Sequence, residues 1–184
     1  MATRTRPATA SSPPSAAPPP SFAGFVVRLM LYLFGASLLF SLGNLHIHML
    51  PVQEAMASVV TAGANLFGAE ASVASTIIRA KSTALEINHE CTGVFVLVVY
   101  AAFVLAYPAP AWERASGIAI GFATLLGVNV ARLILLTLIA SSYPDWFAYF
   151  HEYFFQGLFI ALLAFLASVW TEQVRRAAIS RLPT

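Results

Sequence analysis

The sequence ECTGVFVLVVYAAFVLAY, residues 90–107, decides how the chain is built. It joins the only cysteine, Cys91, to an uninterrupted run of apolar residues. Such a run predicts a membrane-spanning helix with the thiol at its boundary. A single cysteine cannot form a disulfide within the chain, so Cys91 is an inert apolar residue, a ligand or a reactive nucleophile. The other apolar segments help to decide between these hypotheses.

The composition indicates an integral membrane protein. Of the 184 residues, 59% are hydrophobic and 10% are charged, which is too few charges to coat a soluble domain. The net charge of +2 comes from arginines near the ends of apolar runs, so the bilayer is the expected partner and nucleic acid is not. The sequence also has no phosphate-binding glycine loop, no Cys-x-x-Cys and no His-Glu-x-x-His, which excludes the commonest nucleotide, redox and zinc-peptidase classes.

The N-terminal part of the chain divides into a polar tail and a first span. Residues 1–21 contain six prolines among Ala, Ser and Thr, a composition typical of a disordered tail. Residues 22–43 are long enough to cross a hydrocarbon layer of about 30 Å and too long for a signal-peptide core, so we predict a signal anchor. Arg28 lies in its first turns, from which its side chain can reach the nearer surface.

Residues 44–90 form the one sizeable segment predicted outside the membrane. Pro51 starts a stretch that predicts an amphipathic helix to about Phe67. Residues 76–80 and 83–88 flank Lys81-Ser82, and the second run alternates in polarity, which favours a small β-hairpin. A second interfacial helix remains an alternative, with an apolar face built from Val73, Ile77, Ile78 and Leu85.

The predicted fold class is an all-α polytopic membrane protein with about four transmembrane helices. Its membrane domain covers residues 22–171, and a basic tail covers 172–184. The turn at residues 108–110 contains two prolines and ends the second span. Aromatic residues in the loop 141–151 favour a membrane interface. The four predicted spans are 22–43, 92–107, 115–140 and 153–170.

The basic residues predict the orientation. Seven of them fall on the side of both termini: Arg4, Arg6, Arg28, Arg114, Arg175, Arg176 and Arg181. Arg79 and Lys81 fall on the other side. Basic residues are enriched in cytoplasmic segments, so both termini are predicted to be cytoplasmic and residues 44–90 to lie outside, at the plasma membrane.

This topology brings three chemically reactive side chains to one depth. Cys91 begins the second span and His151 begins the fourth, both on the outer side. Arg132 lies eight residues before the outer end of the third span at Ala140, about 12 Å at 1.5 Å per residue. An arginine side chain can cover much of that distance, so the guanidinium can approach the thiol and the imidazole.

The third span carries a stripe that predicts an inward-facing Arg132. Gly117, Gly121, Asn129 and Arg132 fall on one side of a helical wheel. The two glycines permit close approach of a neighbouring helix, and Asn129 is placed to orient the arginine from one turn away. The plainer alternative is that Arg132 reaches the surface or pairs with Asp145 or Glu152.

A thiol beside an arginine and at a helix N-terminus is expected to ionise readily, which favours Cys91 as a nucleophile. His151 is then the expected acid and base, with His89, two residues before Cys91, as its rival. His46 and His48 could bind a metal, but no third ligand is evident, so neither a metal nor another cofactor is predicted.

Together these motifs resemble the exosortase and archaeosortase family. The resemblance rests on Cys91-Thr92-Gly93 at the start of a span, Asn129-x-x-Arg132 within the next and His151 opening the last, in that order. It covers roughly residues 25–170. Longer exosortases carry additional helices before this core, so the chain resembles a compact subtype, for which exosortase H is a candidate.

The resemblance implies a membrane cysteine peptidase or transpeptidase. Its substrates would be exported proteins with a C-terminal sorting signal made of a short motif, a transmembrane helix and a basic tail. Cys91 would form a thioester, Arg132 would stabilise the thiolate or the oxyanion, and His151 would transfer protons. Thr92 and Gly93 would offer backbone N–H groups to the oxyanion.

A different class remains open. In a non-enzymatic scaffold or transporter accessory subunit, Arg132 would pair with an acidic residue of a partner helix and Cys91 would only pack. A disulfide-exchange enzyme is disfavoured because one cysteine supplies no resolving thiol.

Overall fold

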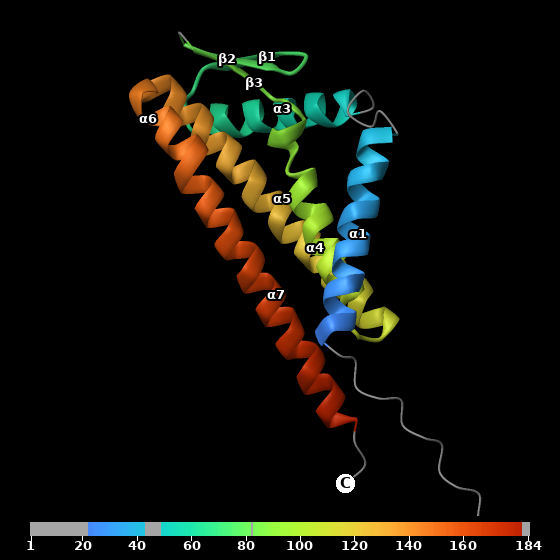
Figure 1. Ribbon diagram of the computed structural model, residues 1–184. Helices are drawn as coiled ribbons and strands as arrows, with labels where there is room; N and C mark the ends of the chain where they lie inside the picture. Colours follow the sequence, from blue (N-terminus) through green and yellow to red (C-terminus); the bar gives the residue numbers. More distant parts are fainter. Residues whose placement is uncertain (1–21, 43–48, 82, 182–184) are drawn as a thin grey trace, which may run out of the picture.

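The protein is described by a computed structural model that covers residues 22–42, 49–81 and 83–181. The predicted tail 1–21, His46 and His48 lie outside the described residues, as do residues 182–184. Within the described ranges the chain is an assembly of long helices capped at one end by a helix and a small sheet (Figure 1). The predicted all-α membrane class is confirmed.

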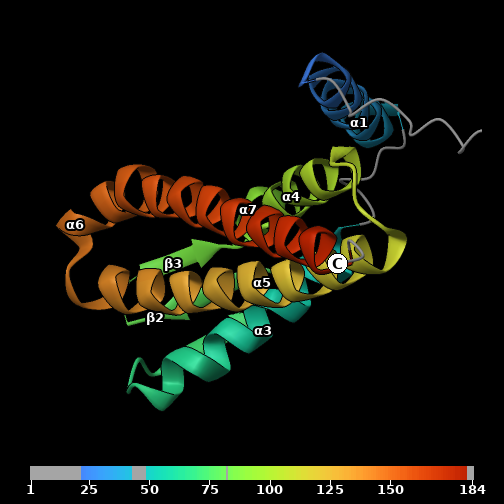
Figure 2. The same ribbon diagram turned by 90° about the horizontal axis from the view of Figure 1, so that it is seen from below.

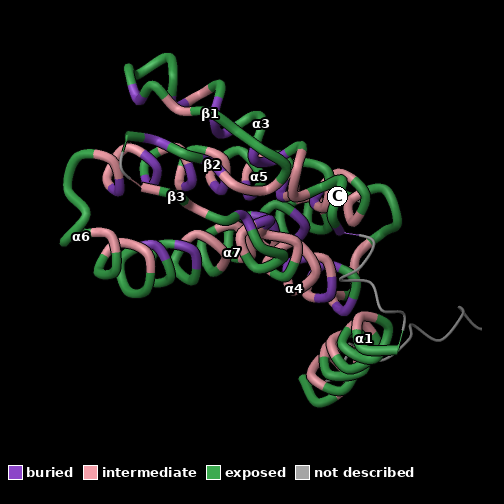
Figure 3. Tube along the Cα trace, turned by 90° about the horizontal axis from the view of Figure 1, so that it is seen from above, coloured by how far each residue is buried: buried purple, intermediate pink, exposed green. Residues whose placement is uncertain are grey.

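Three helical segments are long and apolar enough to cross a bilayer. They are α1 (Phe22–Leu42), α5 (Ala111–Ser142) and the segment Pro144–Ser180. The last consists of α6 (Pro144–Tyr149), the π-helical turn η2 (Phe150–Phe154) and α7 (Phe155–Ser180). None of the residues of α1 is buried, and the helix stands apart from α5 and α7, beside α4 (Val94–Ala106) (Figures 2 and 3). This exposure fits a helix surrounded by lipid.

The predicted second span is a shorter helix than expected. Helix α4 (Val94–Ala106) has 13 residues, about 20 Å at 1.5 Å per residue, against a hydrocarbon layer of about 30 Å. It follows Gly93, whose φ of 75° turns the chain into the helix, and it ends before Pro108. Helix α4 contacts α1, α5 and α7. The predicted count of about four spans corresponds to three long helices and this short one.

The helices extend beyond the predicted spans at three places. Helix α5 begins at Ala111, directly after Pro110, four residues before the predicted start at Ala115. The predicted loop 141–151 is mostly helical, because Pro144 starts α6 at the first helical position, where proline is favoured. Tyr143 alone connects α5 to α6, and α7 continues past the predicted end of its span at residue 170 to Ser180.

The outer segment forms two layers over the end of the helices (Figure 1). Helix α3 (Leu50–Leu66) confirms the predicted amphipathic helix and lies across the bundle. Strands β2 (Ile77–Ala80) and β3 (Thr83–Glu86) pair antiparallel and confirm the predicted hairpin, while the alternative of a second helix is wrong. Strand β1 (Ala71–Ala74), which was not predicted, pairs with the other edge of β2.

Two apolar clusters hold the layers together. The outer cluster packs α3 and the sheet on α5 and α7, and its members include Met56, Val60, Ile78, Leu136 and Phe155. The inner cluster joins α4, α5 and α7 through Tyr100, Val104, Leu125, Trp170 and Val174. The candidate site described below lies between these clusters.

The predicted stripe on α5 faces the interior of the bundle. Gly117, Gly121 and Asn129 are buried. A Cβ atom at Gly117 would overlap the Trp170 indole, and one at Gly121 would overlap the Tyr100 ring. The absence of side chains at both positions therefore allows α4 and α7 to approach α5 closely.

We expect Gly121→Val to destabilise the protein by about 1–3 kcal/mol, because the new side chain overlaps the buried Tyr100 ring. The matched control is Gly127→Val on the same helix, where an added Cβ meets nothing within 4 Å. Thermal unfolding of the purified proteins in detergent measures the difference. Equal melting temperatures for the two variants would contradict the packing described here.

Candidate active site

Cys91 lies in a short turn between the sheet and α4. Residues His89–Thr92 form the 3₁₀ turn η1. The Asn88 side chain caps it by accepting a hydrogen bond from the Cys91 N–H at 3.0 Å, and the Thr92 hydroxyl donates to the His89 carbonyl at 2.7 Å. These bonds fix the backbone that carries the thiol. The sequence analysis did not predict this turn, although asparagine is a favoured cap and the spacing Asn88-x-x-Cys91 is a signal that could have indicated it.

Asn129 ties this turn to α5. Its amide nitrogen donates to the Cys91 carbonyl at 2.8 Å, and its side chain is buried. The contact requires the glycine at position 93, where a Cβ would lie 3.1 Å from the Asn129 side chain. The sequence predicted that Asn129 orients Arg132, but the bond that the structure shows goes to the cysteine backbone instead.

Arg132 is held between an imidazole and two phenyl rings. Its Nη2 lies 3.5 Å from Nδ1 of His151, and its Cζ lies 5.9 Å and 5.5 Å from the centroids of Phe155 and Phe159. The distances to the two phenyl rings are within the range of cation–π attraction. The salt bridges found among the described residues do not include the predicted alternative with Asp145 or Glu152.

The His151 ring is positioned by stacking. It lies on Phe147, with ring centroids 5.3 Å apart and planes inclined by 12°. Phe147 comes from α6, and His151 lies in the π-helical turn that follows. The imidazole is therefore fixed by its own helical segment on one side and faces Arg132 on the other.

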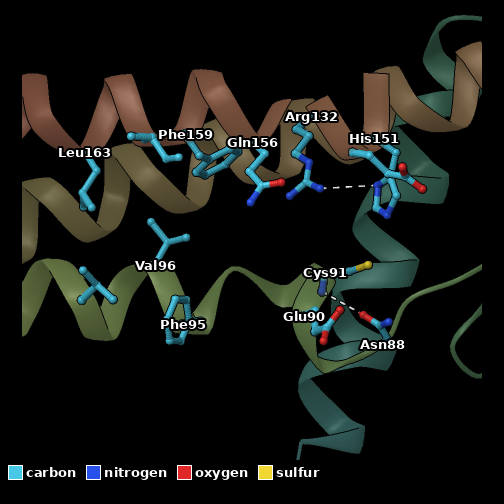
Figure 4. Close-up of a pocket in the computed structure, with 13 residues that line it drawn as sticks. Asn88, Glu90, Cys91, Phe95, Val96, Arg132, His151, Gln156, Phe159 and Leu163 are labelled. Atoms are coloured by element: carbon cyan, nitrogen blue, oxygen red, sulfur yellow. Dashed lines mark hydrogen bonds between the residues drawn. The ribbon is translucent and has the colours of Figure 1, made fainter. Parts of the chain in front are cut away.

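Cys91, Arg132 and His151 line one cavity of about 560 Å³ (Figure 4). They come from three separate elements, η1, α5 and η2, as the sequence predicted. His89 does not line this cavity but a different one that α1 borders. The polar residues Asn88, Glu90, Glu152 and Gln156 also line the shared cavity. The sequence indicated no role for Asn88, Glu90 and Gln156, because an isolated polar residue at a helix end carries no distinctive pattern, and it indicated Glu152 only as an alternative partner of Arg132.

Burial dominates the ionisation of the thiol. Removal from water raises the pKa of Cys91 above the ordinary thiol value, while a backbone hydrogen bond with Asn88 and the charge of Arg132 lower the pKa, and Glu90 raises it. Arg132 therefore lowers the pKa of the thiol, as predicted, but burial raises that pKa by a larger amount. The raised pKa favours the protonated thiol at neutral pH, which corrects the ready ionisation expected from the sequence.

No cluster of three or more histidine, cysteine, aspartate or glutamate side chains with the arrangement of a metal site occurs in the described ranges. The polar groups of the cavity are instead a thiol, a guanidinium, an imidazole, amides and carboxylates. This set supports nucleophilic attack and proton transfer.

The fold and the cavity together define a class: a polytopic helical membrane protein with one cysteine, one arginine and one histidine on a shared cavity near one end of the bundle. A comparison with protein families identifies the class more closely. The transmembrane exosortase family matches residues 10–170, so the chain belongs to the exosortase family, as its motifs had indicated. Comparisons with curated proteins and with solved structures gave no match.

The pH dependence of Cys91 alkylation tests the electrostatics. Because burial raises the pKa, we expect the rate with iodoacetamide to keep rising above neutral pH and past the range of an ordinary thiol. Arg132→Gln should move the profile to still higher pH, because a charge that lowers the pKa is lost.

The matched control is Glu90→Gln, which should move the profile to lower pH, because Glu90 raises the pKa. Cys91 is the only cysteine of the chain, so all labelling reports on this site. A rate that levels off at neutral pH in the unsubstituted protein would contradict the assignment.

Proposed function

We propose that the chain is a membrane cysteine peptidase or transpeptidase that cleaves C-terminal sorting signals of exported proteins. One observation carries the proposal: the only thiol of the chain shares a cavity with Arg132 and His151, although the three residues come from separate elements. Membership of the exosortase family supports the same chemistry. The substrate would be a protein whose C-terminal helix anchors it in the bilayer.

The first step is acyl transfer to the thiol. Sγ of Cys91 attacks the carbonyl carbon of the scissile peptide bond, and the thiol proton passes to His151 as the carbon–sulfur bond forms. Because burial keeps the thiol protonated, this proton must leave during the attack and not before it. The carbon–nitrogen bond then breaks, the imidazole returns the proton to the leaving amine, and a thioester remains on Cys91.

Arg132 stabilises the negative charge that develops on the carbonyl oxygen. Its guanidinium is held beside aromatic rings in a partly dry cavity, where a fixed charge counts for more than in water. The N–H groups of Thr92 and Gly93 are further candidates for the oxyanion site, because they belong to the same turn as the thiol. In the second step His151 activates water or an acceptor amine, which attacks the thioester and frees Cys91.

The positions of the basic residues support a site on the outer face of the plasma membrane. Arg28, Arg114 and Arg176 lie near the start of α1, the start of α5 and the end of α7, which share one end of the bundle (Figure 1). Arg79 lies in the sheet at the opposite end, where η1 also lies. Because basic residues favour the cytoplasm, this arrangement supports a topology with both termini inside and Cys91 outside.

Substrate processing tests the chemical roles. A cellular protein with a C-terminal apolar helix should accumulate in its long form in cells that carry Cys91→Ala or Cys91→Ser, because neither variant can form the thioester. His151→Ala should block processing as well. His89→Ala is the matched control and should leave most processing intact, because His89 borders a different cavity.

Immunoblots of cells with equal amounts of each variant measure the ratio of long to short form. Retained cleavage with Cys91→Ser would refute the nucleophile and favour the scaffold alternative. An inactive His89 variant beside an active His151 variant would reverse the assignment of the base.

The orientation is tested by labelling single cysteines in the Cys91→Ala background. Cysteines at the exposed positions Ser58 and Ser142 should react in intact cells with a thiol reagent that does not cross membranes, because both lie at the outer end. A cysteine at Ser180, at the end of α7, should react only after the cells are opened. The reverse pattern would refute the proposed topology.

A further inference from the structure

The cavity that holds the thiol changes in character along its length. At its outer end it is lined by Cys91, Arg132, His151 and neighbouring polar groups. At its inner end its walls are apolar: Phe95, Val96 and Val99 on α4, and Phe159, Ile160 and Leu163 on α7. Figure 4 shows Val96 and Leu163 on facing helices, away from the reactive groups. One continuous groove therefore joins a polar site to an apolar slot.

The inner end of the groove is closed by aromatic contacts between the same two helices. Phe103 on α4 and Tyr107 just after it lie with ring centroids 6.4 Å and 5.4 Å from that of Trp170 on α7. These rings hold α4 and α7 together, whereas toward Cys91 the two helices separate enough to form the cavity. The groove is thus a wedge that is closed at the inner end.

The rims of the wedge open to the apolar surroundings of the bundle. Phe95 on α4 is 74% exposed, and Ile160 on α7 is 64% exposed. Both residues line the groove, so neither helix seals it from the side. An apolar segment that moves within the bilayer can therefore reach the groove without leaving the hydrocarbon layer.

From this geometry we propose that the groove between α4 and α7 binds the first turns of the substrate's transmembrane helix, with the scissile bond held at its polar end. The inference rests on the proposed function, because it deepens the account of the same site. Gln156 and Leu163 on α7 both line the groove and are seven positions apart, about 10 Å along the helix axis at 1.5 Å per residue. The groove therefore accommodates about two helical turns of the anchor.

The second large cavity near the site is a poorer candidate for the anchor. It lies between α1 and α4, where Leu33 and Phe40 form part of its wall. The two cavities share much of their lining, namely Glu90, Phe95, Val96, Val99, Arg132 and Phe159. Cys91 and His151, however, line the groove between α4 and α7 and not the cavity beside α1. An anchor between α1 and α4 would therefore lie beside a cavity that the thiol does not line.

Disulfide cross-linking to the trapped substrate tests the location. The enzyme carries Cys91→Ala and one new cysteine, Ile160→Cys. The partner is the long form that accumulates with Cys91→Ala, with single cysteines placed in the first turns of its apolar helix. We expect oxidation to give a cross-link from position 160. The matched controls are Ser37→Cys on α1, beside the other cavity, and Leu158→Cys, which is exposed on α7 outside both cavities.

Cross-links from position 37 and not from position 160 would overturn the inference while leaving the peptidase function intact. The inference would also be overturned, with the peptidase function intact, if position 160 gave no cross-link although the enzyme with Cys91 processed the substrate. Absence of any long form in the Cys91→Ala cells would instead contradict the proposed function.

A second measurement needs no substrate and separates the two proposals further. Alkyl methanethiosulfonates of increasing chain length react with Cys91 in the purified protein, and a chain that lies in the groove should accelerate the reaction. The measured quantity is the ratio of the reaction rate of a long-chain reagent to that of a short-chain reagent. Ile160→Trp or Leu163→Trp should lower this ratio by roughly fourfold for each CH₂ group excluded from the groove.

Leu158→Trp is the control and should leave the ratio of long-chain to short-chain rates unchanged, because Leu158 does not line the groove. The Ile160 side chain is largely exposed, so its replacement leaves the core unchanged. An unchanged dependence on chain length in both groove variants would overturn the inference, whatever the outcome of the processing assay.

Discussion

The hydrogen bond from Asn129 to the Cys91 carbonyl is the constraint on which the candidate site depends. It joins the turn that carries the thiol to the helix that carries the arginine, at 2.8 Å and in a buried position. Asn129 and Arg132 are three residues apart on α5, so they lie on one side of that helix, about 4.5 Å apart along its axis. Fixing Cys91 to Asn129 therefore also fixes the level of the thiol relative to the guanidinium. A bond of this kind contributes about 1 kcal/mol to stability, yet its loss would leave buried polar groups unpaired at a larger cost.

Burial and charge oppose each other at this site. Arg132 favours the thiolate, but the apolar cluster that packs against Cys91 removes the thiol from water, and that effect is larger. In the proposed mechanism the site therefore has two parts with separate tasks. The positive charge of Arg132 would stabilise the oxyanion, and the neighbouring imidazole of His151 would transfer the proton. In a partly dry cavity this division avoids a buried thiolate, which would be costly in the absence of substrate.

Sequence predicted the features that depend on local pattern and missed those that depend on packing. The hairpin of β2 and β3 followed from alternating polarity, and the inward face of α5 followed from the spacing of its glycines. Strand β1 has the sequence Ala-Ser-Val-Ala, which carries no alternation strong enough to predict a strand. The aromatic residues before His151 suggested an interfacial loop, because composition cannot show that Tyr143 alone makes the turn. The level shared by Cys91, Arg132 and His151 was predictable from topology. The partner of Asn129 and the burial of the thiol were not, because both depend on how the turn at 89–92 docks against α5.

The π-helical turn explains how one helical segment can present both the imidazole and the rings that flank the arginine. In a uniform α-helix, His151 and Phe159 would differ in direction by about 80°, since eight residues at about 100° each exceed two turns by that angle. A π-helical turn has about 4.4 residues per turn, or about 82° per residue, and it covers the steps from Phe150 to Phe154. Three of the eight steps from His151 to Phe159 lie within that turn, so the difference in direction falls to about 25°, and His151 and Phe159 face nearly the same way. Arg132 can therefore contact His151 and Phe159 at once, as its distances of 3.5 Å and 5.5 Å require. Single π-helical turns are frequent at functional sites, and here the turn has a definite geometric effect: it brings the His151 imidazole and the Phe159 ring beside the guanidinium onto one face of one segment.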